Sequence, residues 1–239
     1  MDCRFTSTNL SIPHKLSTSK SHKLPTSLLG CCKAQSKQES SSTATSTQPQ
    51  PQSTTTPYKI RFQTLQACTL GISRYPDFEY NAEGGIGTAT GEKLATTGEE
   101  LLVNFDIESL YIPALTGATT RFLGSPLPPF LKIEIAPEDF RGCINSESGM
   151  VELEFKAKFR FSIGSLYKAP PLVVKTTLTS EESKGLIRSG KGKRMDGEGR
   201  CRLVGVATVD PVNDLLLDSF LGLPTECIAD LNAQISVNS

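Results

Sequence analysis

The sequence contains no tryptophan and only two histidines, His14 and His22, both of which precede residue 57. The rest of the chain therefore has no imidazole. Imidazole is the base of Ser-His-Asp and Cys-His nucleophilic sites, and it is a frequent ligand of zinc and iron. These classes of site are excluded for residues 57–239. We expect no catalytic residues, no metal, no cofactor and no enzyme activity in this part of the chain.

Long apolar runs and closely spaced cysteines are also missing. No run approaches the roughly 20 apolar residues of a membrane-spanning helix. Cysteines at positions 68, 143, 201 and 227 form no CxxC pair, so a tetrahedral cysteine site is poorly supported. Their spacing leaves a disulfide open, since distant residues can meet across strands. Buried thiols are the more common outcome for isolated cysteines.

Acidic residues are scarce in the first 56 residues, which hold six Lys and Arg against Asp2 and Glu39 and are rich in Ser and Thr. This composition is typical of a chloroplast transit peptide, which we assign to residues 1–34. Residues 35–56 have no aromatic or branched aliphatic side chain and predict a disordered Ser/Thr/Gln/Pro-rich linker. A low-complexity tail is the alternative. No second targeting stretch is evident, so we expect the chloroplast stroma or a stroma-facing membrane surface.

Residues 57–239 carry 19 Lys and Arg against 23 Asp and Glu, the balance of an ordinary soluble surface. The segment is long enough to bury a core of its own. It contains no clustered basic helix, and we expect no nucleic-acid partner.

The clearest pattern in this segment is the strict alternation of VELEFKAKFRF, residues 151–161. Alternation with a period of two places all the apolar side chains on one face of a strand, which a helix cannot do. Similar patterns predict strands at 58–65, 101–107, 131–135, 201–209 and 230–237, with a further strand at 171–178. Residues 211–222 predict a short helix.

These strands predict an all-β domain over residues 57–239. Strands with one solvated face, separated by turn residues, pair antiparallel and must bury their apolar face against another layer or by closure. Because long strands twist and coil, we expect a single barrel-like or strongly curved antiparallel sheet. A two-sheet sandwich is the alternative.

An apolar segment rich in Pro and Gly, residues 110–133, is too broken to be one strand. It predicts a ligand-binding or docking surface. The alternative is that it packs over the end of the sheet. Its candidate residues are Tyr111, Ile112, Phe122, Leu123, Leu127 and Phe130.

A basic, Gly-rich stretch, SGKGKRMDGEGRCR at residues 189–202, suggests a phosphate-binding loop at first sight. It lacks the Ser or Thr after Lys, and a strand follows it instead of a helix, so the phosphate-loop motif is not met. We interpret it as a hairpin connection with DGEG as its turn. Contact with an anionic surface is the functional hypothesis, and a solvated turn is the alternative. The candidate contact residues are Lys184, Arg188, Lys191, Lys193 and Arg194.

Three functions remain open from the sequence. The first is a non-catalytic plastid domain that binds an apolar ligand, such as a lipid, pigment or isoprenoid, or a membrane surface. The second is an accessory or assembly factor that docks on a thylakoid or envelope protein complex. The third is an enzyme that works without histidine.

Overall fold

Strands make up nearly all of the regular structure in residues 57–94 and 100–238, which are the residues that the computed structural model describes. The all-β prediction is confirmed. The elements are β1 (Tyr58–Thr64), β2 (Cys68–Ile72), β3 (Phe78–Tyr80), β4 (Ile86–Lys93), β5 (Glu100–Phe105), β6 (Thr120–Phe122), β7 (Ser125–Pro126), β8 (Leu131–Asn145), β9 (Val151–Ile163), β10 (Tyr167–Lys168), β11 (Leu172–Thr179), β12 (Glu182–Lys184), β13 (Ser189–Lys191), β14 (Arg200–Val209), α1 (Leu215–Leu221) and β15 (Thr225–Asn238).

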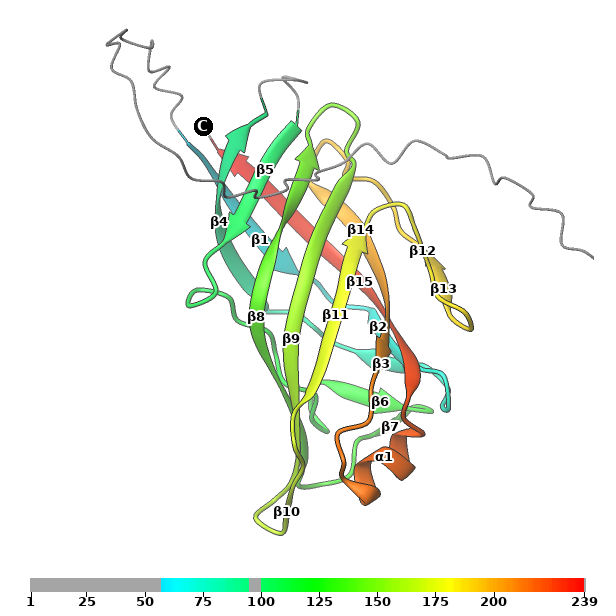
Figure 1. The fold of residues 1–239 in the computed structure, drawn as a ribbon. Helices are drawn as coiled ribbons and strands as arrows, with labels where there is room; N and C mark the ends of the chain where they lie inside the picture. Colours follow the sequence, from blue (N-terminus) through cyan, green and yellow to red (C-terminus); the bar gives the residue numbers. More distant parts are fainter. Residues whose placement is uncertain (1–56, 95–99, 239) are drawn as a thin grey trace, which may run out of the picture. The chain divides into compact units, whose positions relative to one another are not determined.

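Eight of these strands pair into a closed antiparallel ring in the order β1-β4-β5-β8-β9-β11-β14-β15 (Figure 1). The ring closes where β1 pairs with the second half of β15, from Lys59 opposite Asn238 to Thr64 opposite Ala233. It is uneven, because β8 and β9 pair along nearly their whole length whereas β11 and β14 share one ladder pair, Thr179 with Val204. The strongly curved single sheet predicted from the sequence is confirmed, and the two-sheet alternative is wrong.

The first half of β15 carries the sheet beyond the ring. Residues 227–230 pair with β2, and the sheet continues through β3 and β6 to β7. This extension crosses one end of the ring, where α1 and β10 also lie (Figure 1). The described residues thus form a ring that is covered at one end by a short sheet and a helix.

Helix α1 lies within the segment predicted to be helical. Asp214 caps its first turn by accepting a hydrogen bond from the backbone N–H of Leu217 at 2.9 Å, and Gly222 ends it with a left-handed φ of 70°. Its residues Leu217 and Leu221 form its buried face. Within the described ranges, no helix is long and apolar enough to cross a membrane.

A packed core fills the part of the ring nearest β4 and β5. Fully buried aliphatic side chains from β5, β8, β9 and β14 meet there, and a layer of phenylalanines covers them. At the centre of this layer, the Phe140 ring lies 5.4 Å from that of Phe62, 4.3 Å from that of Phe105 and 5.7 Å from that of Phe155, centroid to centroid. Beyond this aromatic layer, two smaller clusters of buried apolar side chains leave part of the interior unfilled.

Candidate ligand-binding cavity

The unfilled part of the interior is a cavity of about 540 Å³. Ligand sites in proteins commonly have volumes of roughly 300–1,000 Å³. The walls of the cavity come from the inner faces of β8, β9, β11, β14 and β15, from the β2–β3–β6–β7 extension and from the last turn of α1. Phe140 and Phe155 separate it from the packed core.

Small residues on two strands make this space. Ala207 of β14 and Ala229 of β15 lie on the cavity wall. Gly205 of β14 also lines it, but a Cβ there would lie 2.8 Å from Thr176 Oγ1 and 2.9 Å from Leu178 Cδ2, so this glycine allows β11 to pack closely. Phe159 and Phe161 on β9 line the same space. Both are only half-buried although they lie on the apolar face of their strand and contact neighbouring apolar side chains, because part of each ring faces the cavity.

The wall is almost entirely apolar, and none of the described residues that line it is charged. Its hydroxyl groups are largely committed to the protein itself. Tyr80 donates to the carbonyl of Pro113 at 2.5 Å, Tyr75 to that of Phe220 at 2.7 Å and Thr176 to that of Val206 at 2.8 Å. A molecule bound here would meet apolar surface and few hydrogen-bonding groups.

Cysteine chemistry is suppressed in the same region. Cys227 lines the cavity, and burial raises the pKa of its thiol to about 11, so the thiol stays protonated near neutral pH. Burial likewise raises the pKa of Cys201 to about 12 and that of Cys68 above its usual value. These three cysteines carry free thiols. The cavity therefore offers no activated sulfur nucleophile.

The apolar segment singled out in the sequence is divided between the cavity and the surface. Four of its six candidates line the cavity: Tyr111, Ile112, Phe122 and Leu127. Leu123 and Phe130 do not line it, and they are 73% and 79% exposed.

The wall residues of β2, β14 and β15 were missed by sequence reasoning. The available signal was alanine at inward positions of β14 and β15, Ala207 and Ala229, where an ordinary core strand would carry Val, Leu or Ile. A small residue at such a position does not say whether a neighbour fills the space, as Thr176 and Leu178 do beside Gly205.

The cavity reaches the surface close to α1. Five lining residues are exposed to solvent: Tyr111, Ser125, Pro126, Pro128 and Phe220. Phe220 belongs to the last turn of α1, and Ser125 and Pro126 form β7.

The basic stretch begins with β13, which pairs with β12 in a separate two-stranded hairpin whose turn is at residues 185–188, and it ends in β14. DGEG forms a turn between Lys193 and Arg202, which pair as an isolated bridge: Asp196 accepts from the backbone N–H groups of Glu198 and Arg200, and Gly199 has a φ of 77°. It does not join β11 directly to β14 as predicted, because the β12–β13 hairpin lies between them. Of the five candidate basic residues, Lys184 pairs with Glu182 and Arg194 with Glu181. Lys191 and Lys193 are exposed.

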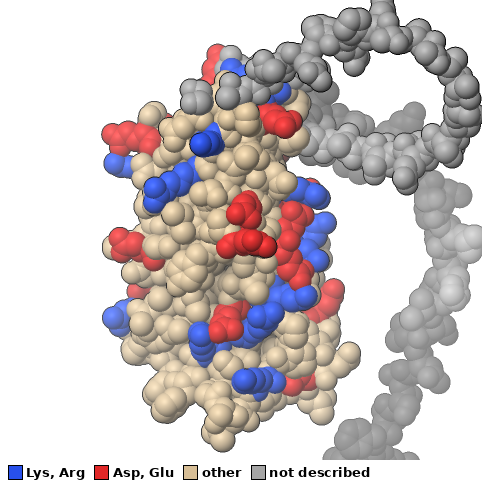
Figure 2. Space-filling view, turned by 90° about the vertical axis from the view of Figure 1, so that its left-hand side faces the viewer, with Lys and Arg blue, Asp and Glu red and all other residues tan. Residues whose placement is uncertain are grey.

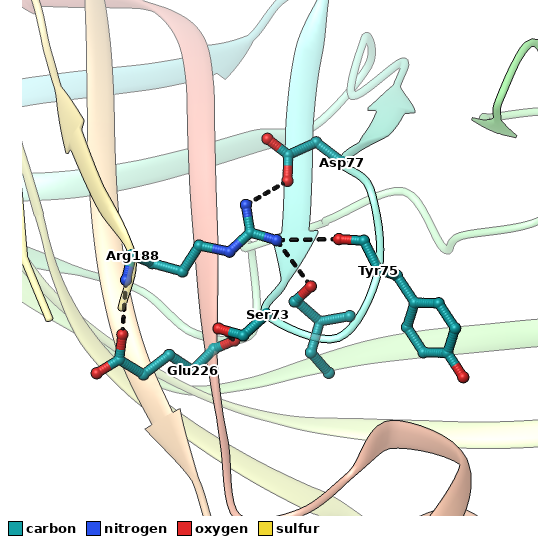
Figure 3. Close-up of polar contacts among 6 residues, drawn as sticks. Ser73, Tyr75, Asp77, Arg188 and Glu226 are labelled. Atoms are coloured by element: carbon teal, nitrogen blue, oxygen red, sulfur yellow. Dashed lines mark hydrogen bonds and ion pairs between the residues drawn. The ribbon is translucent and has the colours of Figure 1, made fainter. Parts of the chain in front are cut away.

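Arg188 is turned toward the protein (Figure 3). Its guanidinium donates to Asp77 Oδ1 at 2.6 Å and to the carbonyls of Ile72 and Tyr75 at 2.8 and 3.0 Å. Its side chain is 21% exposed. Because Ile72 and Tyr75 line the cavity, Arg188 supports the outer side of the cavity wall.

The carboxylate of Glu226 holds the hairpin from the opposite side. It accepts the backbone N–H groups of Leu186, Ile187 and Arg188 at 2.6, 2.8 and 2.8 Å. These hydrogen bonds lower the pKa of Glu226 below its usual value. Glu226 and Arg188 together fix the hairpin to β15 and to the loop after β2.

No group of three acidic, cysteine or histidine residues that could hold a metal is found among the residues that the structure describes. Comparisons of the chain with protein-family models, with curated proteins and with solved structures gave no match. The function therefore has to be inferred from the geometry of the cavity.

Proposed function

We propose that this chain is a non-catalytic plastid protein that binds one apolar small molecule, such as a lipid, pigment or isoprenoid, inside the ring. The observation that carries the proposal is the cavity of about 540 Å³ with its uncharged wall. Apolar surface removed from water contributes roughly 25 cal/mol per Å² to binding. A ligand with a long apolar body would gain this contribution along the whole wall.

The committed hydroxyl groups favour binding over chemistry. A reaction inside the cavity would need a base, a nucleophile or an electrophile that faces the substrate. The three hydroxyls of Tyr75, Tyr80 and Thr176 already donate to backbone carbonyls. A polar group on the ligand is better placed at the opening, beside Ser125 and Tyr111.

The proposal is tested on the full chain, purified without detergent. We expect organic extraction and mass spectrometry to find one apolar molecule per chain, and a fluorescent fatty-acid analogue to bind saturably to the emptied protein. Ala229→Phe, which places a large side chain in the cavity, should abolish both. Ala118→Phe adds the same ring at an exposed site and should abolish neither. Absence of an extractable molecule together with absence of saturable probe binding would overturn the proposal.

A further inference from the structure

One end of the described structure exposes six large apolar side chains, three on loops and three on α1: Leu123, Phe130, Leu166, Leu215, Leu216 and Phe220. We call these six residues the apolar end. Leu166 and Leu215 are 92% and 91% exposed. Figure 2 shows mostly uncharged surface at the bottom of the view, the end where α1 and β10 lie in Figure 1.

Hydrogen bonds link the elements that carry these side chains, although the elements are far apart in the sequence. The backbone N–H of Gly164 donates to the carbonyl of Phe130, which joins the β9–β10 turn to the start of β8. Tyr167 donates to Asp214 at 2.8 Å and thereby joins β10 to the beginning of α1.

Tyr75 completes the connection on the other side of α1. Its ring packs against those of Phe122 and Phe220, at centroid distances of 6.2 and 5.6 Å. Leu123, next to Phe122, is thereby linked to the last turn of α1. The six side chains therefore form one region of the surface.

Part of the exposed cavity wall lies in this region. Phe220 belongs both to the apolar end and to the cavity wall, and β7, which is also on the wall, directly follows Leu123 and Gly124. Molecules apolar enough to occupy the cavity are concentrated in lipid and scarce in water. A surface around this part of the wall would most effectively collect them while in contact with lipid.

The charges around the apolar end suit the headgroup layer of a bilayer. Arg121 and Lys168 flank it, both are exposed, and among the described residues neither has an acidic partner within 4.0 Å. The acids of α1 bond inward, since Asp214 accepts from Leu217 and Asp218 from the backbone N–H of Val212. Apolar side chains on projecting turns, with cations beside them, are the pattern of a protein that rests in a membrane interface.

We propose that the apolar end inserts into the surface of a lipid bilayer, so that the cavity opens onto the acyl chains and its ligand passes between membrane and protein without crossing water. The direction of ligand transfer rests on the proposed function. The contact with lipid does not, because it follows from the exposed side chains and their charges.

The test is flotation of the full chain with vesicles of phosphatidylcholine alone and of phosphatidylcholine with phosphatidylglycerol. The double variant Leu166→Gln/Leu215→Gln should lower the partition coefficient about tenfold or more on both kinds of vesicle, since each leucine loses the gain of leaving water. The matched control Leu186→Gln/Ile187→Gln alters two residues on the β12–β13 hairpin that are 98% and 74% exposed, and it should bind like the parent. The basic leader is present in all three chains, so its own affinity for anionic vesicles cancels in the comparison.

A further variant, Arg121→Gln/Lys168→Gln, should weaken binding to the anionic vesicles only. All variants should keep the parent's thermal midpoint, because the altered side chains are exposed.

Several results would overturn the inference. These are a parent that does not float, a double variant that floats as well as the parent, or equal losses in the double variant and the hairpin control. If sedimentation without lipid gives the mass of a dimer for the parent and that of a monomer for the double variant, the apolar end binds a second copy of the chain instead. Binding of the fatty-acid probe without vesicle binding would refute the lipid contact and leave the proposed function standing. Vesicle binding without probe binding would support the lipid contact and refute the proposed function.

Discussion

Phe159 and Leu153 lie on the same face of β9, but their side chains have different surroundings. Leu153 is fully buried in the packed core, whereas Phe159 is half-buried and borders the cavity. The alternating sequence predicts that both point inward, and the structure agrees. It could not predict that one would pack against protein and the other against open space, because this depends on how small the residues of β14 and β15 are opposite them.

Truncation at these two positions should separate core from cavity. Leu153→Ala should lower the free energy of unfolding by about 2–5 kcal/mol, since it removes packed contacts and leaves a void. Phe159→Ala should cost less than the roughly 3–5 kcal/mol typical of a buried phenylalanine, because part of its surface already faces empty space. Urea unfolding of the full chain measures both.

Arg160→Ala, at the exposed position next to Phe159, serves as the control and should change stability by no more than about 0.5 kcal/mol. If Phe159→Ala proves as costly as Leu153→Ala, the space in front of Phe159 is filled in solution.

Among the elements, the long alternating strands were predictable and the short or glycine-rich ones were not. β9, β14 and β15 alternate over many residues, and both their existence and their pairing direction followed from that pattern. β4 escaped prediction because its inward positions hold Gly87, Ala89 and Gly91, which carry little hydropathy signal. A larger residue there would displace a neighbour: a Cβ on Gly91 would lie 2.6 Å from Ile60 Cδ1, and one on Gly87 2.8 Å from Leu110 Cδ1.

The β12–β13 hairpin is the element whose attachment depends most clearly on one charge. Glu226→Gln should loosen it, because the neutral amide replaces one acceptor oxygen by a donor that faces backbone N–H groups. Hydrogen exchange should be faster at the amides of Leu186, Ile187 and Arg188, while Glu79→Gln, on the surface of β3, should leave them unchanged. Equal protection in the parent and in Glu226→Gln would mean that the carboxylate does not hold the hairpin.

The same contact gives a pH dependence of known sign. The pKa of Glu226 is lower in the folded chain than in the unfolded one, where it is about 4.3. Its stabilising contribution is therefore complete above that value and is lost as the pH falls through the lowered folded pKa. The difference in stability between the parent and Glu226→Gln should be largest near neutral pH and should shrink on acidification, as urea titrations at a series of pH values would show.

At the scale of the whole molecule, the sequence predicted a curved sheet but not its partly empty interior. A cavity depends on the summed volumes of inward side chains from all the strands that surround it, and no single segment carries that information. The apolar segment was the part of the sequence that best indicated the cavity, since four of its six candidates line the wall. Apolar residues in a Pro-rich loop need an apolar surface to pack against. The leader and linker assignments fall outside the described residues and remain predictions.

The chloroplast assignment is open to a direct test. Residues 1–57 fused to a fluorescent protein should direct it into chloroplasts, because this segment is basic, hydroxylated and nearly free of acids. Residues 35–57 alone, which lack the proposed transit peptide, should leave the fluorescence in the cytosol. Diffuse cytosolic fluorescence from the longer fusion would contradict the assignment.

The pairing of β1 with β15 has a consequence for how the chain is made. Ribosomes release a polypeptide from its N-terminus, so β1 emerges early and has its partner on one side, β4, long before β15 exists. Until β15 has been synthesised, β1 and β14 each present an unpaired strand edge, and such edges recruit strands of other chains. Ring closure also joins residues separated by most of the described sequence, which makes it a slow step. The nascent protein is therefore most vulnerable to aggregation just before its final strand appears, and a holdase chaperone would protect it best at that stage.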